Sequence, residues 1–350
     1  MRKTVLIAVA FVAVALLATA AAAAADADLS KSTLYVDSQW LKANLGNVVL
    51  VDARPKDQYK KGHIPGAVNA EWTRFANMKG RPGNPGWGDL YSKGTLAKKI
   101  GALGINAKRP VVVYASGGGW GQDGWVAWIL KLSGVQNVKL LEKGYPGWKA
   151  VQGKISGGVS RNKSVGFSIP SFQGGYNVTT PWLAAKLNEV KIIDARTPFE
   201  YEGGRLFGEK RGGHIPGAVN IPYDTVLNDD MTVRPVEDIK TIMAVRGVYP
   251  QDEIIVYDTA GVRSAYLVLV LRMAGFDKAR NYDSSFQEWA GNMKLEVVQG
   301  TEPGGHVAEA ESQVSDQPAS GDVTDDNAAN DTAPGDETLT EEESQQDKVS

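Results

Sequence analysis

Two stretches of the sequence repeat one another and decide the fold. They read VDARPKDQYKKGHIPGAVN at residues 51–69 and IDARTPFEYEGGRLFGEKRGGHIPGAVN at residues 193–220. Both contain Asp-Ala-Arg followed by Gly-His-Ile-Pro-Gly-Ala-Val-Asn, but the second copy carries nine extra residues between these two motifs. A repeat of this length indicates two similar domains rather than a solenoid of short units.

Apolar runs place strands before and after these motifs. The runs at residues 48–51 and 192–193 lead into the two Asp-Ala-Arg motifs, and those at residues 111–114 and 254–257 each precede a longer apolar stretch that predicts a helix. Strands that alternate with helices favour an α/β fold, in which helices flank a parallel sheet. Binding sites in such sheets lie beyond the carboxyl ends of the strands, where both Asp-Ala-Arg motifs are expected.

The repeat also sets the domain boundaries. We predict a first domain at residues 30–155 and a second domain at residues 173–300. Small and polar residues predominate at residues 156–172, which we interpret as the linker. A chain of 350 residues suits this division, because single domains commonly contain ~150 residues.

The first 25 residues have the pattern of an export signal. Arg2 and Lys3 precede an apolar stretch at residues 5–17, and an alanine-rich run ends at Ala25. We therefore expect cleavage after Ala25 and a periplasmic or extracellular protein with no membrane contact afterwards. The alternative is an uncleaved membrane anchor, since the apolar stretch is long enough to cross a bilayer.

The formal net charge of −2 conceals an acidic tail. Residues 301–350 contain fourteen Asp or Glu residues, one Lys and no aromatic residue, whereas residues 26–300 carry a net charge of +9. A segment of this composition cannot bury a core, so we expect it to be disordered. It either keeps the protein soluble, contacts a protein partner or folds back on the basic body.

The composition excludes several kinds of site. Cysteine is absent, which rules out disulfides, thiolate metal sites and cysteine nucleophiles. His63, His214 and His306 are scattered, so we predict no metal site. The glycine-rich stretch at residues 117–125 departs from the dinucleotide-binding pattern, so we predict no cofactor. Lys and Arg form no dense run, so we expect no nucleic-acid partner.

The two repeats, together with the stretch IIVYDTAGVRSAYLVLVLRMAGF at residues 254–276, resemble the tandem rhodanese family of thiosulfate and 3-mercaptopyruvate sulfurtransferases. The resemblance extends over roughly residues 34–295. It implies two tandem rhodanese-like domains, of which only the second is catalytic. In such enzymes a cysteine opens a six-residue loop whose backbone N–H groups surround its sulfur, and that cysteine carries the transferred sulfur as a persulfide.

Asp258 stands where the resemblance places this cysteine. The remaining loop residues are Thr259, Ala260, Gly261, Val262 and Arg263. The matching position in the first domain is Ala115, so neither domain offers a sulfur nucleophile. The resemblance also implies that Arg196 contacts the substrate.

Three interpretations of Asp258 remain open. In the first, its carboxylate fills the loop itself, because converging N–H groups at a helix N-terminus stabilise negative charge, and the protein is a binding or scaffolding pseudoenzyme. In the second, Arg196 and Arg263 still bind a small anion, a sulfur compound or a peptide carboxylate. In the third, the protein is an enzyme, either of sulfur-compound metabolism or with Asp258 as nucleophile or base in different chemistry. Persulfide transfer through Asp258 is excluded, because a carboxylate has no sulfur to carry.

Other conspicuous polar residues are expected to be structural. His63 and His214 come from duplicate turns in two domains, so we predict that they hold these turns by hydrogen bonds. Asp52 and Asp194 end strands, and in the family that the chain resembles the equivalent carboxylates organise loops.

The first domain also contains an insertion and a group of tryptophans. Residues 80–91, GRPGNPGWGDLY, are an insertion of the first copy, and their Pro and Gly content predicts a surface loop. Whether this loop lies beside a cleft between the domains is left open by the sequence. Trp125 and Trp128 lie at helical spacing, which predicts packing in the core or the domain interface; an aromatic surface shared with Trp120 is the alternative.

Overall fold

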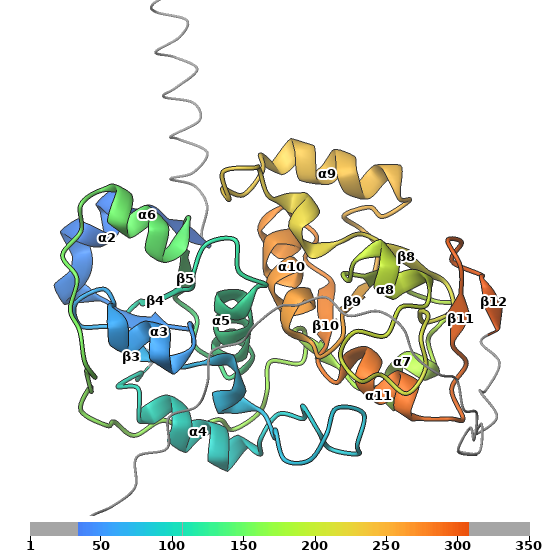
Figure 1. The fold of residues 1–350 in the computed structure, drawn as a ribbon, viewed down its shortest axis with the longest axis horizontal. Helices are drawn as coiled ribbons and strands as arrows, with labels where there is room; N and C mark the ends of the chain where they lie inside the picture. The colour runs from blue at the N-terminus through green and yellow to red at the C-terminus, as the bar shows by residue number, and fades with distance from the viewer. Residues whose placement is uncertain (1–33, 107, 308–350) are drawn as a thin grey trace, which may run out of the picture. The chain divides into compact units, whose positions relative to one another are not determined.

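The computed structural model describes residues 34–106 and 108–307 (Figure 1). The predicted export signal at residues 1–25 and the predicted tail from residue 308 onward lie outside the described residues. Within the described part of the chain, no helix is both long enough and apolar enough to cross a membrane.

The first domain alternates strands and helices. In chain order its elements are β1 (Tyr35–Val36), α2 (Ser38–Asn44), the 3₁₀ turn η1 (Leu45–Asn47), β2 (Val49–Asp52), α3 (Lys56–Lys61), β3 (Val68–Asn69), η2 (Trp72–Phe75), α4 (Lys93–Gly101), β4 (Val111–Tyr114), α5 (Gln122–Leu132), β5 (Val138–Leu141) and α6 (Gly144–Ala150).

The second domain repeats this order with small differences. Its elements are β6 (Asn177–Val178), α7 (Thr180–Ala184), β7 (Lys191–Asp194), α8 (Pro198–Glu202), β8 (Ala218–Asn220), η3 (Tyr223–Val226), α9 (Val236–Val245), β9 (Ile254–Tyr257), α10 (Val262–Met273), β10 (Ala279–Tyr282) and α11 (Ser285–Gly291). A short pair of strands, β11 (Val298–Gln299) and β12 (His306–Val307), follows.

Each domain contains one parallel sheet, as the sequence predicted, and each sheet has five strands. The strand orders are β1-β5-β4-β2-β3 and β6-β10-β9-β7-β8, so the second sheet repeats the topology of the first. The β4 and β9 strands occupy the middle of the two sheets, and the loops that follow them open above the carboxyl ends of the strands. This is the edge at which the candidate site was expected.

Apolar side chains cover both faces of each sheet. In β2, Val49 and Val51 belong to one hydrophobic cluster and Leu50 belongs to another. In β9, Ile254 and Ile255 are divided in the same way. Successive side chains of a strand point to opposite faces, so this division shows two packed faces and explains why the strands are continuous apolar runs.

Helices α5 and α10 join the two domains (Figure 1). Their close packing is evident at Gly124 of α5, where an added Cβ would lie 2.5 Å from the Cβ of Tyr266 in α10. The hydroxyl of Tyr266 lies 2.8 Å from that of Tyr35 in the first domain. Trp125 and Trp128 are buried beside this contact and stack at 5.3 Å, so they belong to the interior and not to an aromatic surface.

Two segments between and after the domains are ordered by backbone hydrogen bonds. The predicted linker runs along the first domain, where the N–H of Val165 donates to the carbonyl of Gly101 at 3.0 Å. The second domain extends beyond its predicted end at residue 300, because β12 pairs with β11 and the N–H of Gly217 donates to the carbonyl of Pro303 at 2.8 Å.

Candidate functional site

The loop after β9 closes around the carboxylate of Asp258. Its Oδ1 atom accepts hydrogen bonds from the backbone N–H groups of Ala260, at 3.0 Å, and of Gly261. Its Oδ2 atom accepts the backbone N–H of Arg263 at 2.7 Å. Asp258 is 2% exposed. The side chain therefore occupies the anion site of its own loop, which is the geometry that the first interpretation requires.

Close backbone contacts determine the shape of this loop. Gly261 has a φ of +83°, and a Cβ at this position would lie 2.2 Å from the carbonyl oxygen of Asp283. Only glycine fits both requirements. The backbone N–H of Asp258 donates to the hydroxyl of Ser285 at 3.1 Å, so the start of α11 supports the loop from the other side.

Arg263 joins this loop to helix α8. Its Nη1 and Nη2 atoms donate to the carboxylate of Glu200 at 2.8 and 2.7 Å, and its Nε lies 3.3 Å from Oδ2 of Asp258. Burial alone would raise the pKa of Glu200, but the hydrogen bonds and charge of Arg263 outweigh it and lower this pKa to about 2. The same pairing keeps the pKa of Arg263 raised. Both side chains are therefore charged at neutral pH.

The two Asp-Ala-Arg motifs form the same buried ion pair in both domains. Nη2 of Arg196 donates to Asp194 and to the carbonyl of Gly213, each at 2.6 Å. Arg54 and Asp52 repeat the ion pair at 2.6 Å. Arg196 is 0% exposed and is not among the residues that line the pocket described below. Asp194 holds one edge of the guanidinium, and Nη1 is buried without a hydrogen-bond partner in the described part of the chain. The substrate contact that the resemblance implied for Arg196 stays a prediction.

The two histidines of the duplicate turns are fully buried. Nδ1 of His63 lies 3.0 Å from the carbonyl oxygen of Tyr59, and Nδ1 of His214 lies 2.9 Å from that of Tyr201. Each ring also stacks on the same tyrosine, at 4.0 and 3.7 Å. These contacts fit the structural role that was expected for both residues. In residues 34–106 and 108–307, no group of three or more His, Asp or Glu side chains is placed to hold a metal ion.

The matching loop of the first domain is nearly filled. Ala115 takes the position of Asp258, and the cavity beside it has a volume of only about 40 Å³. Side chains of the second domain occupy the remaining space: Met231 lines this cavity, and the hydroxyl of Tyr223 donates to the carbonyl of Gly119 at 2.9 Å. The first-domain loop therefore leaves no room for a ligand of more than a few atoms.

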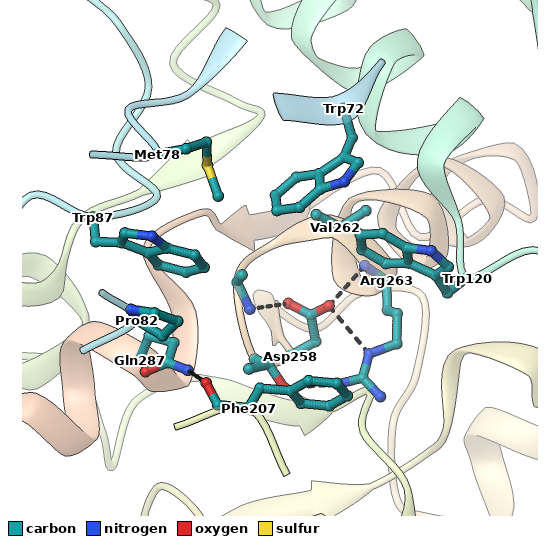
Figure 2. Close-up of a pocket in the computed structure, with 12 residues that line it drawn as sticks. Trp72, Met78, Pro82, Trp87, Trp120, Phe207, Asp258, Val262, Arg263 and Gln287 are labelled. Atoms are coloured by element: carbon teal, nitrogen blue, oxygen red, sulfur yellow. Dashed lines mark hydrogen bonds and ion pairs between the residues drawn. The ribbon is translucent and has the colours of Figure 1, made fainter. Parts of the chain in front are cut away.

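The second-domain loop faces a much larger pocket of about 580 Å³ between the two domains (Figure 2). Asp258 and Arg263 lie on one side of it, and Thr259 and Gln287 contribute the other polar groups. The remaining lining residues are apolar or aromatic. They are Trp72, Met78, Pro82, Trp87, Trp120, Phe207, Ala260 and Val262. A pocket of this size, with apolar walls and a few polar groups, is typical of sites for small organic molecules.

Part of the pocket wall comes from the segments in which the two copies differ. Pro82 and Trp87 belong to the insertion at residues 80–91, which was predicted as a surface loop. Asn77 orders this insertion, because its side chain donates to the carbonyl of Gly86 at 2.8 Å. Phe207 belongs to the extra residues of the second copy. The domain contact brings these two segments against each other, since a Cβ at Gly208 would lie 3.6 Å from the Cβ of Pro82.

Asp258 and Arg263 were predictable as site residues from the sequence, but several other residues of the site were not. Glu200 was overlooked, although the pattern Thr-Pro-Phe-Glu at residues 197–200 indicates a capping box, which the structure contains. Trp72 and Phe207 were also overlooked. No local pattern marks them, because each reaches the pocket only when the two domains pack together.

The family of the chain follows from sequence comparison. The model of the rhodanese-like domain matches residues 37–151 and 179–292, which together cover most of the described chain and contain four of the five strands of each sheet. The chain belongs to the rhodanese family. It carries two rhodanese domains in tandem and contains no cysteine.

Two similar proteins match this chain over nearly all of their own length. The thiosulfate sulfurtransferase of Corynebacterium glutamicum is 28% identical over 283 residues, which cover 76% of this chain and 90% of that protein. The thiosulfate sulfurtransferase of Pseudomonas aeruginosa is 30% identical over 266 residues, which cover 73% and 93%.

Solved structures show the same two-domain fold. The 3-mercaptopyruvate sulfurtransferase relative SseA from Escherichia coli is 27% identical, with a TM-score of 0.62 over 72% of this chain and 98% of that one. An anaerobic ergothioneine biosynthesis enzyme from Chlorobium limicola, solved with its substrate trimethyl histidine, is 21% identical. It has a TM-score of 0.69 over 78% of this chain and 71% of that one, a likeness that concerns the fold alone.

Proposed function

We propose that this protein is a pseudoenzyme of the rhodanese family, a binding protein in which Asp258 replaces the sulfur-carrying cysteine. The observation that carries the proposal is the inward orientation of the Asp258 carboxylate. Both of its oxygens accept N–H groups of the loop, and Nε of Arg263 lies beside one of them. A carboxylate held in this way is a weak nucleophile, because its oxygens are engaged by the donors of the loop and reaction would remove the charge that these donors stabilise.

The same geometry argues against different chemistry at Asp258. A nucleophile or a general base has to reach its substrate, yet Asp258 is only 2% exposed and its oxygens are directed into the loop. The second-domain pocket nevertheless has room for a ligand, about 580 Å³. Retention of this pocket beside a residue unsuited to catalysis supports ligand binding without turnover.

Thiosulfate:cyanide sulfurtransferase activity tests the proposal, measured side by side on the native protein, Asp258→Cys and Asp258→Ser. The serine variant is the matched control, because it is similar in size to cysteine but lacks sulfur. We expect the native protein and the serine variant to be equally inactive. In the cysteine variant, the thiolate should take the sulfane sulfur of thiosulfate and release sulfite, so that its mass increases by one sulfur atom.

Two results would contradict the proposal in different ways. Activity of the native protein above that of Asp258→Ser would show a sulfur-transfer route that needs no cysteine. Turnover of another substrate by the native protein that is lost in Asp258→Asn would show chemistry at the carboxylate.

We also propose export, on the basis of the signal pattern at residues 1–25. Amino-terminal sequencing of the protein purified from cells that make the full chain should find a mature start at Asp26. A full-length chain in the membrane fraction would instead identify the segment as an anchor.

A further inference from the structure

We infer that the pocket beside Asp258 binds a small organic cation whose charged end is a methylated ammonium group. This inference deepens the proposed binding function, since it assumes that Asp258 remains a resident carboxylate. The ligand inferred here is a cation, whereas one interpretation of the sequence was a small anion bound at this loop. Three features of the pocket carry it: its aromatic walls, the charge balance beneath it and the shortage of free hydrogen-bond acceptors.

Four aromatic side chains surround the cavity, and they come from four separate segments of the chain (Figure 2). Trp72 and Trp120 meet edge to face, with ring centroids 5.2 Å apart and planes at 78°, so they form two sides of a corner. Trp87 and Phe207 stand on the opposite side of the pocket in Figure 2. Faces of aromatic rings attract cations, tryptophan most strongly, and rings that meet at an angle suit a rounded cation such as a trimethylammonium group.

A hydrogen bond to a buried helix holds the segment that carries Trp72. The carbonyl oxygen of Trp72 accepts the indole N–H of Trp125 at 3.1 Å, which anchors its segment to the buried helix α5. Trp120 remains 40% exposed, which is unusual because tryptophan side chains are highly buried on average. A ligand in the pocket would cover part of this exposed ring.

The charges beneath the pocket favour a cation. Asp194, Glu200 and Asp258 carry three negative charges, against the two positive charges of Arg196 and Arg263. The N-terminus of helix α10 offsets roughly half a charge, so a negative excess remains. An entering anion would meet the resident carboxylate of Asp258 in the position that it needs, whereas a cation would be attracted to it.

Arg263 does not reverse this preference, although it lines the pocket. Its two amino groups donate to the buried carboxylate of Glu200, which is not among the residues that line the pocket. Its guanidinium carbon lies 5.9 Å from the centre of the Phe207 ring, so this ring already faces one cation. The three tryptophans of the lining are therefore the surfaces that a ligand cation would use.

The shortage of acceptors favours a methylated ammonium over a primary one. A primary ammonium needs several hydrogen-bond acceptors, and one left unpaired in an apolar site costs binding free energy. Both oxygens of Asp258 already accept hydrogen bonds, and Thr259 is paired with Glu200 and Arg263. Among the buried side-chain oxygens of this lining in the described part of the chain, only Oε1 of Gln287 has no hydrogen-bond partner. A methylated ammonium lacks N–H groups to satisfy and is weakly hydrated, so it loses little on entry.

Calorimetric titration with choline and with 3,3-dimethylbutan-1-ol tests the inference at constant ionic strength. The two molecules have nearly the same shape, but carbon replaces the charged nitrogen in the second. We expect choline to bind at least about tenfold more tightly than the alcohol, because cation–π attraction in a desolvated site is worth roughly this factor. Thiosulfate should not compete with choline.

Three variants of the full chain separate the contributions. Trp120→Leu keeps an apolar side chain but removes the ring, and should weaken choline binding by about tenfold with little effect on the alcohol. Trp40→Leu is the matched control, since Trp40 is similarly exposed and lies outside the pocket lining. Asp258→Asn removes the negative charge and should reduce the preference for choline over the alcohol; circular dichroism of each variant confirms folding.

Equal affinity for choline and the alcohol would overturn the inference and identify an apolar site. Tighter binding of thiosulfate, or competition by it, would identify an anion site and overturn the inference as well. Absence of binding by all three probes would also count against it. None of these outcomes bears on sulfur transfer by the native protein, so failure of this inference and failure of the proposed function can be told apart.

Discussion

Arg263 contacts Asp258 twice, through its backbone N–H at 2.7 Å and through its side-chain Nε at 3.3 Å, while its amino groups bind Glu200. One arginine therefore ties the loop after β9 to the helix after β7. The loop in which the family's persulfide-forming cysteine would be expected is here held by ion pairs and hydrogen bonds of the chain itself. This arrangement makes several consequences measurable.

Replacing Asp258 by Asn should destabilise the protein. The side-chain nitrogen of Asn cannot accept a hydrogen bond. At least one backbone N–H that now donates to Asp258 would therefore be left without an acceptor. We expect a loss of about 1–3 kcal/mol in the free energy of unfolding, measured by urea denaturation. Asp57→Asn is the matched control, because Asp57 is 87% exposed and should change stability by less than about 0.5 kcal/mol. An unchanged Asp258→Asn protein would show that the loop does not depend on the carboxylate.

The Glu200–Arg263 pair should make stability fall in acid. The pKa of Glu200 is about 2 in the folded protein, against an ordinary value of 4.5. Because folding lowers this pKa, the ionised Glu200 stabilises the folded protein at pH values above the unfolded-state pKa. This stabilisation is lost as the pH falls from about 4.5 toward 2. Urea unfolding at several pH values should show a flatter acid limb for Glu200→Gln than for the native protein. Glu237→Gln, at an exposed ion pair, should leave that limb unchanged.

Asp283 should have the opposite pH dependence. Burial raises its pKa to about 6, above the ordinary value of 3.8. A carboxyl group with a raised folded-state pKa favours folding while it is protonated, so its contribution is lost as the pH rises from 3.8 to about 6. Asp283→Asn, which keeps the shape of the side chain, should remove this decline. A variant that loses stability equally at all pH values would show that Asp283 acts through its hydrogen bond with Asn177 instead.

Gly124→Ala should loosen the contact between the two domains. The added methyl group would lie 2.5 Å from the Cβ of Tyr266, so helices α5 and α10 would have to move apart. Overpacking of this kind costs about 1–3 kcal/mol, measurable by thermal or urea unfolding. Gly94→Ala in helix α4 is the matched control, because nothing lies within 4 Å of the added atom there. Equal stability of the two variants would mean that the contact adjusts without cost.

Local patterns predicted most of the fold and the centre of the site. The apolar runs at residues 111–114 and 254–257 coincide with β4 and β9, because buried parallel strands need continuous apolar sequence. The hydrogen bonds from the loop's own N–H groups to the Asp258 carboxylate were also predictable, since they join residues no more than five positions apart. The contacts of the loop with Ser285 and Glu200 were not, because these residues lie far away in the sequence. The role of Arg196 was harder to predict, because a neighbouring Asp buries its guanidinium and the sequence does not show burial.

The sequence by itself determined the duplicated fold, the loss of the sulfur nucleophile and the carboxylate that takes its place. These properties depend on residue identity and on contacts between near neighbours in the chain. Only the tertiary structure decided the character of the pocket. Trp87 and Phe207 lie 120 positions apart in the sequence and line the same pocket because α5 packs on α10. Such a contact depends on how two folded domains fit together, and no pattern within either domain encodes it.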